Sequence, residues 1–189
     1  MSSGKIIIIS APSGTGKSTI INRIITDKSL HLQFSVSATN RPPRKGEEDG
    51  VNYYFLSTEA FKTAIAENAF LEYEEVYPGR FYGTLRSEIT RITGQGNNVI
   101  LDIDVKGGIN IKHQYPEALT IFIQPPSIAT LRQRLEGRGT DSQETIDQRV
   151  AKAEYELSFA PKYDKIVTND ILDEAVAQTT AIISDFIKQ

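Results

Sequence analysis

The first 25 residues constrain the fold most strongly. Four consecutive isoleucines occupy positions 6–9, and a run of small residues follows them. An apolar run this short predicts a strand that is buried on both faces. Apolar residues then recur at helical spacing over 20–25, directly after Gly16-Lys17-Ser18. A buried strand, a tight loop and a helix in this order are typical of α/β proteins with a parallel sheet.

The loop itself predicts a phosphate site. Residues 11–18 read Ala-Pro-Ser-Gly-Thr-Gly-Lys-Ser, close to the pattern Gly-x4-Gly-Lys-Ser/Thr. Small residues let successive backbone N–H groups point at phosphate oxygens, and the helix dipole adds positive potential. Lys17 would reach the β- and γ-phosphates, and Ser18 would ligate Mg²⁺. Ala11 replaces the first Gly of the pattern, so we expect a loop that begins in a conformation open to a Cβ.

The rest of the main body alternates strand and helix patterns. Strands are predicted at Val99–Ile103, around Leu119–Ile123 and at Lys165–Thr168, with helical periodicity between them. This alternation predicts a parallel sheet that is flanked by helices on both faces. The fold class is therefore α/β.

Residues 34–84 follow a different pattern. Short strands are predicted at Asn52–Leu56 and Phe70–Val76, with a helix at Glu59–Asn68 between them. We interpret residues 37–84 as a small lobe inserted into a core made of residues 1–36 and 85–189. A total of 189 residues suits one core with such a lobe.

Composition excludes several classes of function. Lys and Arg total 21 and Asp and Glu total 24, giving a net charge of -3, which argues against a nucleic-acid partner. The absence of cysteine excludes disulfides, cysteine metal sites and thiol catalysis. The isoleucine run is far too short for a membrane span, and no membrane partner is expected. We expect a cytoplasmic protein, and the sequence leaves a homo-oligomer open.

Two carboxylates end the strand predicted at Val99–Ile103. Ligands of open parallel sheets sit at the carboxyl ends of the strands, where the phosphate loop also lies. Asp102 or Asp104 would hold Mg²⁺ through water or accept a hydrogen bond from a substrate. Solvated aspartates at a strand end are the alternative, and the neighbouring phosphate loop favours the functional interpretation.

Three arginines follow in the second half of the chain. Arg134 and Arg138 are four residues apart and share a face of one predicted helix, and Arg149 lies on the next helix. Arginines beside glycines suit a flap over a transferring phosphate. A solvated basic helix face explains the spacing equally well.

The inserted lobe carries a second candidate site. Arg41-Pro42-Pro43-Arg44 places two guanidiniums in a stiff segment, which suits a dianionic phosphate. Glu72 lies in an otherwise apolar strand, where it is either exposed at an edge or accepts hydrogen bonds from purine N–H groups. Hydroxyl groups of the same lobe are available from Ser37, Tyr53, Tyr82 and Thr84.

These segments together resemble the guanylate kinases of bacterial type, nearly from end to end of the chain. The resemblance rests on the segments 11–19, 34–44, 50–53, 70–73, 82–84, 101–104 and 134–140. It implies a core, a GMP-binding lobe and a short helical lid at about 135–150. It also implies transfer of the ATP γ-phosphate to GMP, and to dGMP, with Mg²⁺ as cofactor.

The resemblance also implies roles for residues. Those around the transferred phosphate are Lys17, Arg41, Arg134, Arg138 and Arg149. Those at ATP are Ala11, Pro12, Ser13, Gly14, Thr15, Gly16, Lys17, Ser18, Thr19 and Asn169. Those at GMP are Ser37, Arg41, Arg44, Tyr53, Glu72, Tyr82, Thr84 and Asp102. Carboxylates and hydroxyls in this set favour guanine, which offers N1–H and N2–H donors and an O6 acceptor.

Two alternatives and some departures remain. A monophosphate kinase for another base would share the fold, and Ser37, Glu72 and Thr84 argue against it. A non-catalytic guanylate-kinase-like module that binds phosphopeptides would also share the fold, but such modules typically have degraded phosphate loops. Lys106 stands where many family members have Gln, so no role is carried over to it. Thr168 stands where they often have Val, and a single Asp follows Asn169 where two acidic residues are common, so the resemblance constrains the adenine contacts less.

Overall fold

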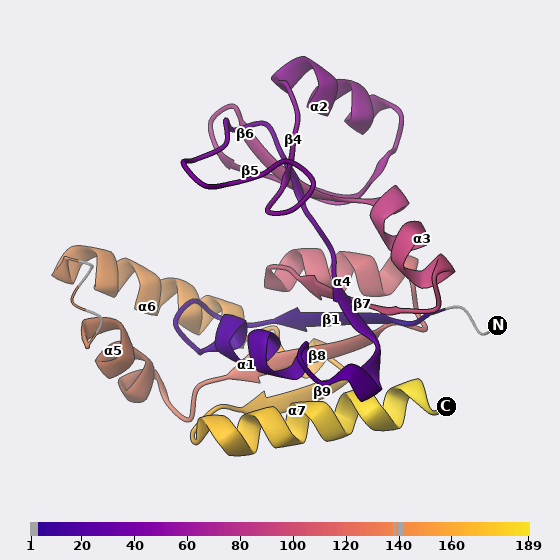
Figure 1. Ribbon diagram of the computed structural model, residues 1–189. Helices are drawn as coiled ribbons and strands as arrows, with labels where there is room; N and C mark the ends of the chain where they lie inside the picture. The colour runs from indigo at the N-terminus through magenta and orange to yellow at the C-terminus, as the bar shows by residue number, and fades with distance from the viewer. Residues whose placement is uncertain (1–3, 138, 140–141) are drawn as a thin grey trace. The chain divides into compact units, whose positions relative to one another are not determined.

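A computed structural model describes residues 4–137, 139 and 142–189 (Figure 1). The chain divides into two compact units. The inserted unit comprises Gln33–Val99 together with Gly4 and Lys5, and the phosphate-loop unit comprises Ile6–Leu32 and Ile100–Gln189. Among the described helices, none combines the length and the apolar character needed to cross a membrane.

The phosphate-loop unit is built on a parallel sheet. In the described part of the chain the sheet has five strands in the order β2-β7-β1-β8-β9, and β8 pairs parallel with both β1 and β9. The strands are β1 (Ile6–Ser10), β8 (Leu119–Gln124) and β9 (Lys165–Thr168), together with β2 (Leu32–Phe34) and β7 (Asn98–Asp102), each of which contains a point where the chain is divided between the two units. The helices are α1 (Lys17–Ile24), η1 (Lys28–Leu30), α4 (Val105–Gln114), α5 (Ile128–Glu136), α6 (Gln143–Leu157), η2 (Ala160–Lys162) and α7 (Leu172–Ile187).

Helices cover both faces of this sheet, as the alternating pattern predicts (Figure 1). Ile7 and Ile9 are fully buried in an apolar cluster with residues of α1 and α7. On the opposite face, Gly108 of α4 lies so close to β1 that a Cβ there would come within 2.8 Å of the Ser10 hydroxyl oxygen. The same Cβ would lie 2.5 Å from the hydroxyl oxygen of Tyr163. The α4 helix therefore packs directly against the strand that leads into the phosphate loop.

The inserted unit has a smaller sheet and its own apolar cluster. The described strands lie in the order β4-β3-β6-β5, with β3–β4 parallel and the other pairs antiparallel. The elements are β3 (Ala38–Thr39), β4 (Tyr54–Phe55), α2 (Thr58–Ala66), β5 (Phe70–Tyr77), β6 (Arg80–Leu85) and α3 (Arg86–Gly94). The ring of Phe61 on α2 stacks on Phe70 and Phe81, with centroids 4.3 and 5.5 Å apart. These three rings join α2 to the two longest strands of the unit.

Several predicted elements are confirmed and others are wrong in extent. The strand at Lys165–Thr168 is β9, and the helix predicted at Glu59–Asn68 is α2, displaced by one or two residues. The strand predicted at Asn52–Leu56 shrinks to the two residues of β4. Strands β2, β3 and β6 were not predicted, because β2 and β3 have only three and two residues and Gly83 interrupts the apolar positions of β6. The predicted lobe, 37–84, falls within the inserted unit, which also contains α3.

Candidate functional site

The phosphate loop lies between β1 and α1, where the sequence predicts it. Gly14 and Gly16 have φ angles of 92° and 89°, a left-handed region that favours glycine. A Cβ would also lie 2.8 Å from a methyl carbon of Leu135 at Gly14, and 2.5 Å from the amide nitrogen of Asn169 at Gly16. Both glycines are thus required by backbone conformation and by close neighbours.

Ala11 starts the loop without strain. Among the described non-glycine residues only His31 and Asn68 have positive φ, so Ala11 adopts an ordinary backbone conformation. Its side chain is buried and joins the apolar cluster of β1, α1 and α7. The expectation of a loop that accommodates a Cβ at this position is confirmed.

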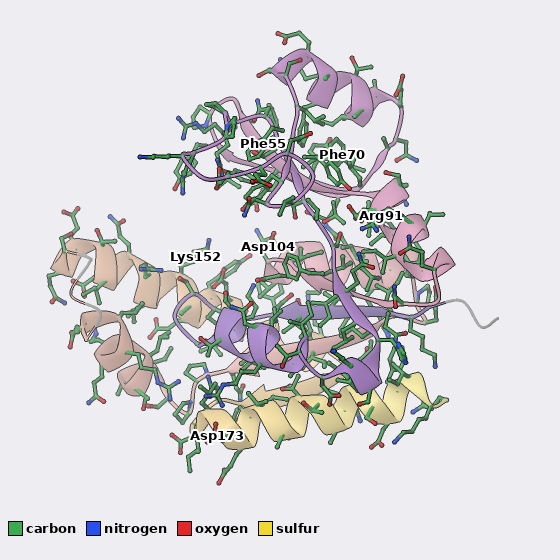
Figure 2. The ribbon with its side chains drawn as sticks, viewed as in Figure 1. Phe55, Phe70, Arg91, Asp104, Lys152 and Asp173 are labelled. Atoms are coloured by element: carbon green, nitrogen blue, oxygen red, sulfur yellow. The ribbon has the colours of Figure 1, made fainter. Side chains whose placement is uncertain are left out.

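Lys17 and Asp102 form an ion pair in this loop. The lysine ammonium contacts the Asp102 carboxylate, and the two side chains are 19% and 24% exposed. Asp102 ends β7, and Asp104 caps the N-terminus of α4 (Figure 2). The Oδ1 atom of Asp104 accepts hydrogen bonds from the backbone N–H groups of Lys106 and Gly107 at 2.8 and 3.0 Å. Asp104 is therefore partly committed to capping the helix.

A cavity of about 360 Å³ lies over the loop. It is lined by residues 11–19 together with Asp102, Asp104 and Glu156. Ser18 contributes a hydroxyl and the three acids contribute carboxylates, which are the oxygen ligands that Mg²⁺ prefers. Within the described residues, no three acidic or histidine side chains are grouped closely enough to hold a metal by themselves. This donor set fits a hydrated Mg²⁺ ion that also takes phosphate oxygens.

The sequence analysis missed Glu156. This residue of α6 is 8% exposed and lines the loop cavity. Burial raises the pKa of its carboxyl group, and Asp104 raises it further, whereas Lys152 and Lys17 oppose the shift. Glu156 follows Arg149 by seven residues, two helical turns, so the spacing alone places both on one face of α6.

Of the three predicted arginines, Arg149 contacts the phosphate loop and Arg134 contacts the segment after β9. Arg149 donates to the hydroxyl of Ser13 at 2.6 Å. Arg134 donates to the backbone carbonyls of Asn169 and Asp170 at 2.8 and 3.1 Å. Arg138 lies outside the described residues, as does part of the predicted lid.

Asn169 links the loop to the end of β9. Its side-chain amide donates to the carbonyl of Thr15 at 2.6 Å, and the residue is only 5% exposed. A second cavity of about 420 Å³ is lined by Asn169 and Arg134 together with the glycines of the loop. The position predicted to lie near the ATP base is therefore tied to the phosphate loop itself.

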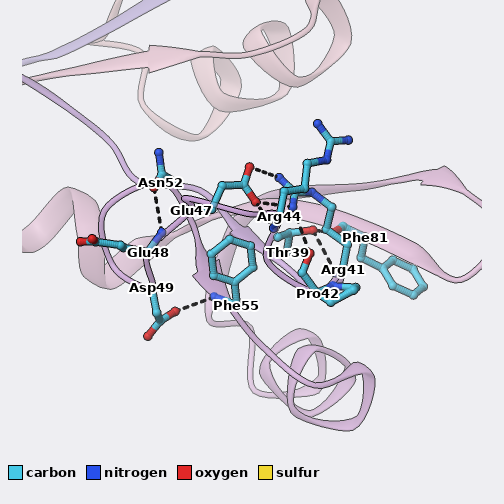
Figure 3. A network of polar contacts seen from close by, with 10 residues as sticks. All are labelled: Thr39, Arg41, Pro42, Arg44, Glu47, Glu48, Asp49, Asn52, Phe55 and Phe81. Atoms are coloured by element: carbon cyan, nitrogen blue, oxygen red, sulfur yellow. Dashed lines mark hydrogen bonds and ion pairs between the residues drawn. The ribbon is translucent and has the colours of Figure 1, made fainter.

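In the inserted unit, Arg41 is the centre of a polar network (Figure 3). It is only 6% exposed. Its Nη1 and Nη2 atoms donate to the two carboxylate oxygens of Glu47 at 2.6 and 2.7 Å. The guanidinium carbon lies 4.9 Å from the ring centroid of Tyr53 and 5.5 Å from that of Phe55. Hydrogen bonding to Arg41 and to the backbone N–H of Arg44 lowers the pKa of Glu47 to about 2.

The other predicted GMP residues divide between the two units. Tyr82 packs edge-on against Tyr53, with centroids 6.0 Å apart, and its hydroxyl helps to raise the pKa of Arg41. Thr84 is buried and donates to a carboxylate oxygen of Glu72 at 2.9 Å across the β5–β6 pair. Ser37 and Arg44 lie in the same unit, directly before β3 and in the loop after it. Asp102 belongs to the phosphate-loop unit.

Glu72 lies at the edge of its sheet, which was one of the two interpretations left open by the sequence. Strand β5 is an edge strand of its sheet. The Glu72 side chain is nevertheless half-buried and oriented by Thr84. A carboxylate held in this way can accept hydrogen bonds from a base.

Two residues that depart from the family pattern make local contacts. The Lys106 ammonium lies 5.4 Å from the ring centroid of Tyr155, a cation–π contact. The Thr168 hydroxyl accepts a hydrogen bond from Gln124 at 3.0 Å, across the β8–β9 pair. Neither residue contacts the phosphate loop through these interactions.

Comparisons with known proteins agree with this geometry. The family model described as guanylate kinase matches residues 3–186. The chain is 58% identical to a guanylate kinase of Bacteroides fragilis, over 97% of this chain and 90% of the relative. It is 55% identical to a guanylate kinase of Porphyromonas gingivalis, over 97% and 98% of the two chains. The crystal structure of guanylate kinase from Anaplasma phagocytophilum matches with a TM-score of 0.75 at 30% identity, covering 100% of this chain and 88% of that one. The chain belongs to the guanylate kinase family.

Proposed function

We propose that this protein transfers the γ-phosphate of ATP to GMP, giving ADP and GDP in purine nucleotide metabolism. The observation that carries the proposal is family membership over nearly the whole chain together with an intact phosphate loop. Residues 14–18 read Gly-Thr-Gly-Lys-Ser, and Lys17 is held by Asp102 in the loop cavity.

The phosphate-loop unit would bind ATP. Backbone N–H groups of the loop and Lys17 would hold the β- and γ-phosphates. Arg149, which hydrogen-bonds Ser13, and Arg134, beside Asn169, supply positive charge at the ends of the loop. We assign Mg²⁺ to Ser18 and, through water, to Asp102 or Asp104. The ion would neutralise charge on the phosphates as they react.

The inserted unit would bind GMP. Arg41, Arg44, Tyr53 and Tyr82 would hold the phosphate, while Ser37, Glu72 and Thr84, with Asp102 of the other unit, would read guanine. All these contacts go to base and phosphate, so dGMP, which lacks only the ribose 2′-hydroxyl, should also be accepted.

No side-chain nucleophile is needed for this reaction. An oxygen of the GMP phosphate attacks the γ-phosphorus of ATP as the bond from that phosphorus to the oxygen bridging to the β-phosphate breaks. The β-phosphate leaves as part of ADP, and no proton transfer is required because the attacking oxygen is ionised. Catalysis would come from positioning and from positive charge around the transferred group.

Release of ADP from ATP–Mg²⁺ tests the proposal. The acceptors are GMP, dGMP, AMP, CMP, UMP and none, and the variants are Lys17→Ala and, as a matched control, Lys62→Ala on the exposed face of α2. We expect strong GMP-dependent turnover that falls at least about 100-fold in Lys17→Ala only. Equal turnover with AMP would refute the guanine assignment of Ser37, Glu72 and Thr84. No acceptor-dependent turnover from folded protein would favour the phosphopeptide-binding module.

A further inference from the structure

The carboxylate of Glu47 joins the two ends of the segment from Arg41 to Glu47 (Figure 3). Glu47 accepts from both terminal nitrogens of Arg41, and its Oε2 atom also accepts from the backbone N–H of Arg44 at 2.7 Å. The backbone N–H of Glu47 donates in turn to the carbonyl of Arg44 at 3.0 Å. Glu47 therefore fixes the guanidinium of Arg41 and the backbone of Arg44 at the same time.

The hydrogen bonds of Arg41 show which edge of its guanidinium Glu47 does not use. A guanidinium has five N–H donors. The bonds to Glu47 use one on Nη1 and one on Nη2, and the second N–H of Nη1 donates to the carbonyl of Pro42 at 3.1 Å. In these bonds the donors not used are on Nε and Nη2, and the Tyr82 hydroxyl also lies within hydrogen-bonding reach of the guanidinium. The Nε and Nη2 donors lie side by side on one edge, in the fork that matches two oxygens of a phosphate.

The surroundings of Arg41 keep it in this orientation. The rings of Tyr53 and Phe55 lie over the guanidinium, and the residue is almost fully buried. A buried arginine without a carboxylate partner would carry an uncompensated charge in the absence of ligand. Glu47 supplies that partner on the edge away from Nε.

We propose that Glu47 is a positioning residue for the acceptor nucleotide: by clamping one edge of Arg41, it presents the Nε–Nη2 edge to the GMP phosphate. The inference deepens the proposed function and rests on it for the identity of the ligand. Glu47 itself need not touch GMP. Glu47 acts on GMP through Arg41, and its effect is confined to the binding of the GMP phosphate.

The test compares Glu47→Gln with Glu48→Gln. Both changes remove one negative charge from neighbouring positions of the same loop, and the Glu48 side chain is exposed. Glu47→Gln should raise the Kd for GMP, measured by calorimetry without ATP, about 10- to 100-fold, and raise the KM for GMP similarly. The KM for ATP should stay within about twofold of wild type, and Glu48→Gln should leave all constants within about twofold. A lower Kd in Glu47→Gln would overturn the proposal, because it would make Glu47 a competitor of the phosphate.

Guanosine separates positioning from a general structural role. It carries the base and sugar but no phosphate, so its Ki as an inhibitor competitive with GMP should be unchanged in Glu47→Gln. An equal loss of guanosine and GMP affinity would mean that Glu47 supports the whole lobe, and the proposal would fail. Thermal unfolding of each variant shows whether the protein remains folded during these measurements.

A double-mutant cycle tests the route through Arg41. Arg41→Lys keeps the charge but lacks the fork of the guanidinium. Glu47→Gln should add less than about a threefold loss of GMP affinity in the Arg41→Lys background. The full 10- to 100-fold loss in that background would show that Glu47 acts independently of Arg41. Should wild type bind GMP without phosphorylating it, the proposed function fails while these binding constants still decide the role of Glu47.

Discussion

The two candidate sites are held in place by different means. In the phosphate-loop unit, the loop follows a strand of fully buried isoleucines, and its shape is set by Gly14 and Gly16. In the inserted unit, Arg41 and Glu72 are oriented by side chains, Glu47 and Thr84. The first site is therefore fixed by backbone geometry and apolar burial. The second depends on hydrogen bonds and ion pairing, which makes it the more sensitive to pH and to single substitutions.

Truncation of the aromatic cluster should produce the largest effect. Phe61 is fully buried and stacks on Phe81. The backbone carbonyl of Phe81 accepts a hydrogen bond from the hydroxyl of Thr39 at 2.9 Å, and Thr39 lies two residues before Arg41. Phe61→Ala should lower the free energy of unfolding by about 3–5 kcal/mol and weaken GMP binding more than ATP binding. Calorimetry with each nucleotide, alongside denaturant unfolding, measures both effects.

The matched control is Phe122→Ala in the phosphate-loop unit. Phe122 is also fully buried and packs edge-on against Tyr163 at 5.2 Å between centroids. The same truncation there should weaken ATP binding more than GMP binding. Equal losses of both nucleotides in both variants would show that the two units do not stabilise their sites separately.

Adding a methyl group at Gly16 should produce the second largest effect. Its φ of 89° and the 2.5 Å approach to Asn169 leave no room for a Cβ. Gly16→Ala should lower kcat about 100-fold, with little change in the Kd for GMP. Steady-state kinetics and GMP calorimetry measure the two quantities.

Gly96→Ala controls for backbone strain alone. Gly96 has a φ of 80°, and a Cβ there would meet no atom within 4 Å. This variant should lose about 1 kcal/mol of stability and retain its kcat. A comparable loss of kcat in Gly96→Ala would mean that a general loss of stability, and not the shape of the loop, explains Gly16→Ala.

The smallest effect concerns pH. Hydrogen bonds from Arg41 and Arg44 hold the pKa of Glu47 at about 2 in the folded chain, below its ordinary value of 4.5. A lowered pKa stabilises the fold above the unfolded value, and this stabilisation is lost as the pH falls towards about 2. The Tm of wild type should therefore exceed that of Glu47→Gln by a constant amount above about pH 5, and the difference should narrow below about pH 4. A difference that persists at about pH 2 would mean that the carboxylate charge is not what stabilises the loop.

The contrast between the sites explains what the sequence could predict. The phosphate loop is contiguous, so its strand, glycines and lysine could be recognised together, and Ala11 was correctly expected to adopt an ordinary conformation. Strand β9 was predicted to the residue because Lys165–Thr168 lies between clear turn signals.

In the inserted unit, the sequence pattern for strands and side-chain contacts was weaker. On strand β6, Tyr82 and Thr84 of the candidate GMP site lie on one face, and Gly83 interrupts the apolar residues Phe81 and Leu85 on the other face. The role of Glu47 depends on a loop that returns the chain towards Arg41, and no periodic pattern reports such a contact. The carboxylate three residues after Arg44 was the available clue. For Glu156, the two-turn spacing from Arg149 was a clue that periodicity analysis could have used.

Gly108 limits which amino-acid substitutions the phosphate-loop unit can accept. Its missing side chain lets α4 sit against Ser10 and Tyr163, and the same helix begins at the capping residue Asp104. A larger side chain there would push the helix outward and move the Asp104 carboxylate away from the loop cavity. The position of Asp104, which lines the loop cavity, therefore depends on the absence of a side chain at Gly108. Substitutions should therefore be tolerated on the outer surface of α4, whereas position 108 should accept only glycine.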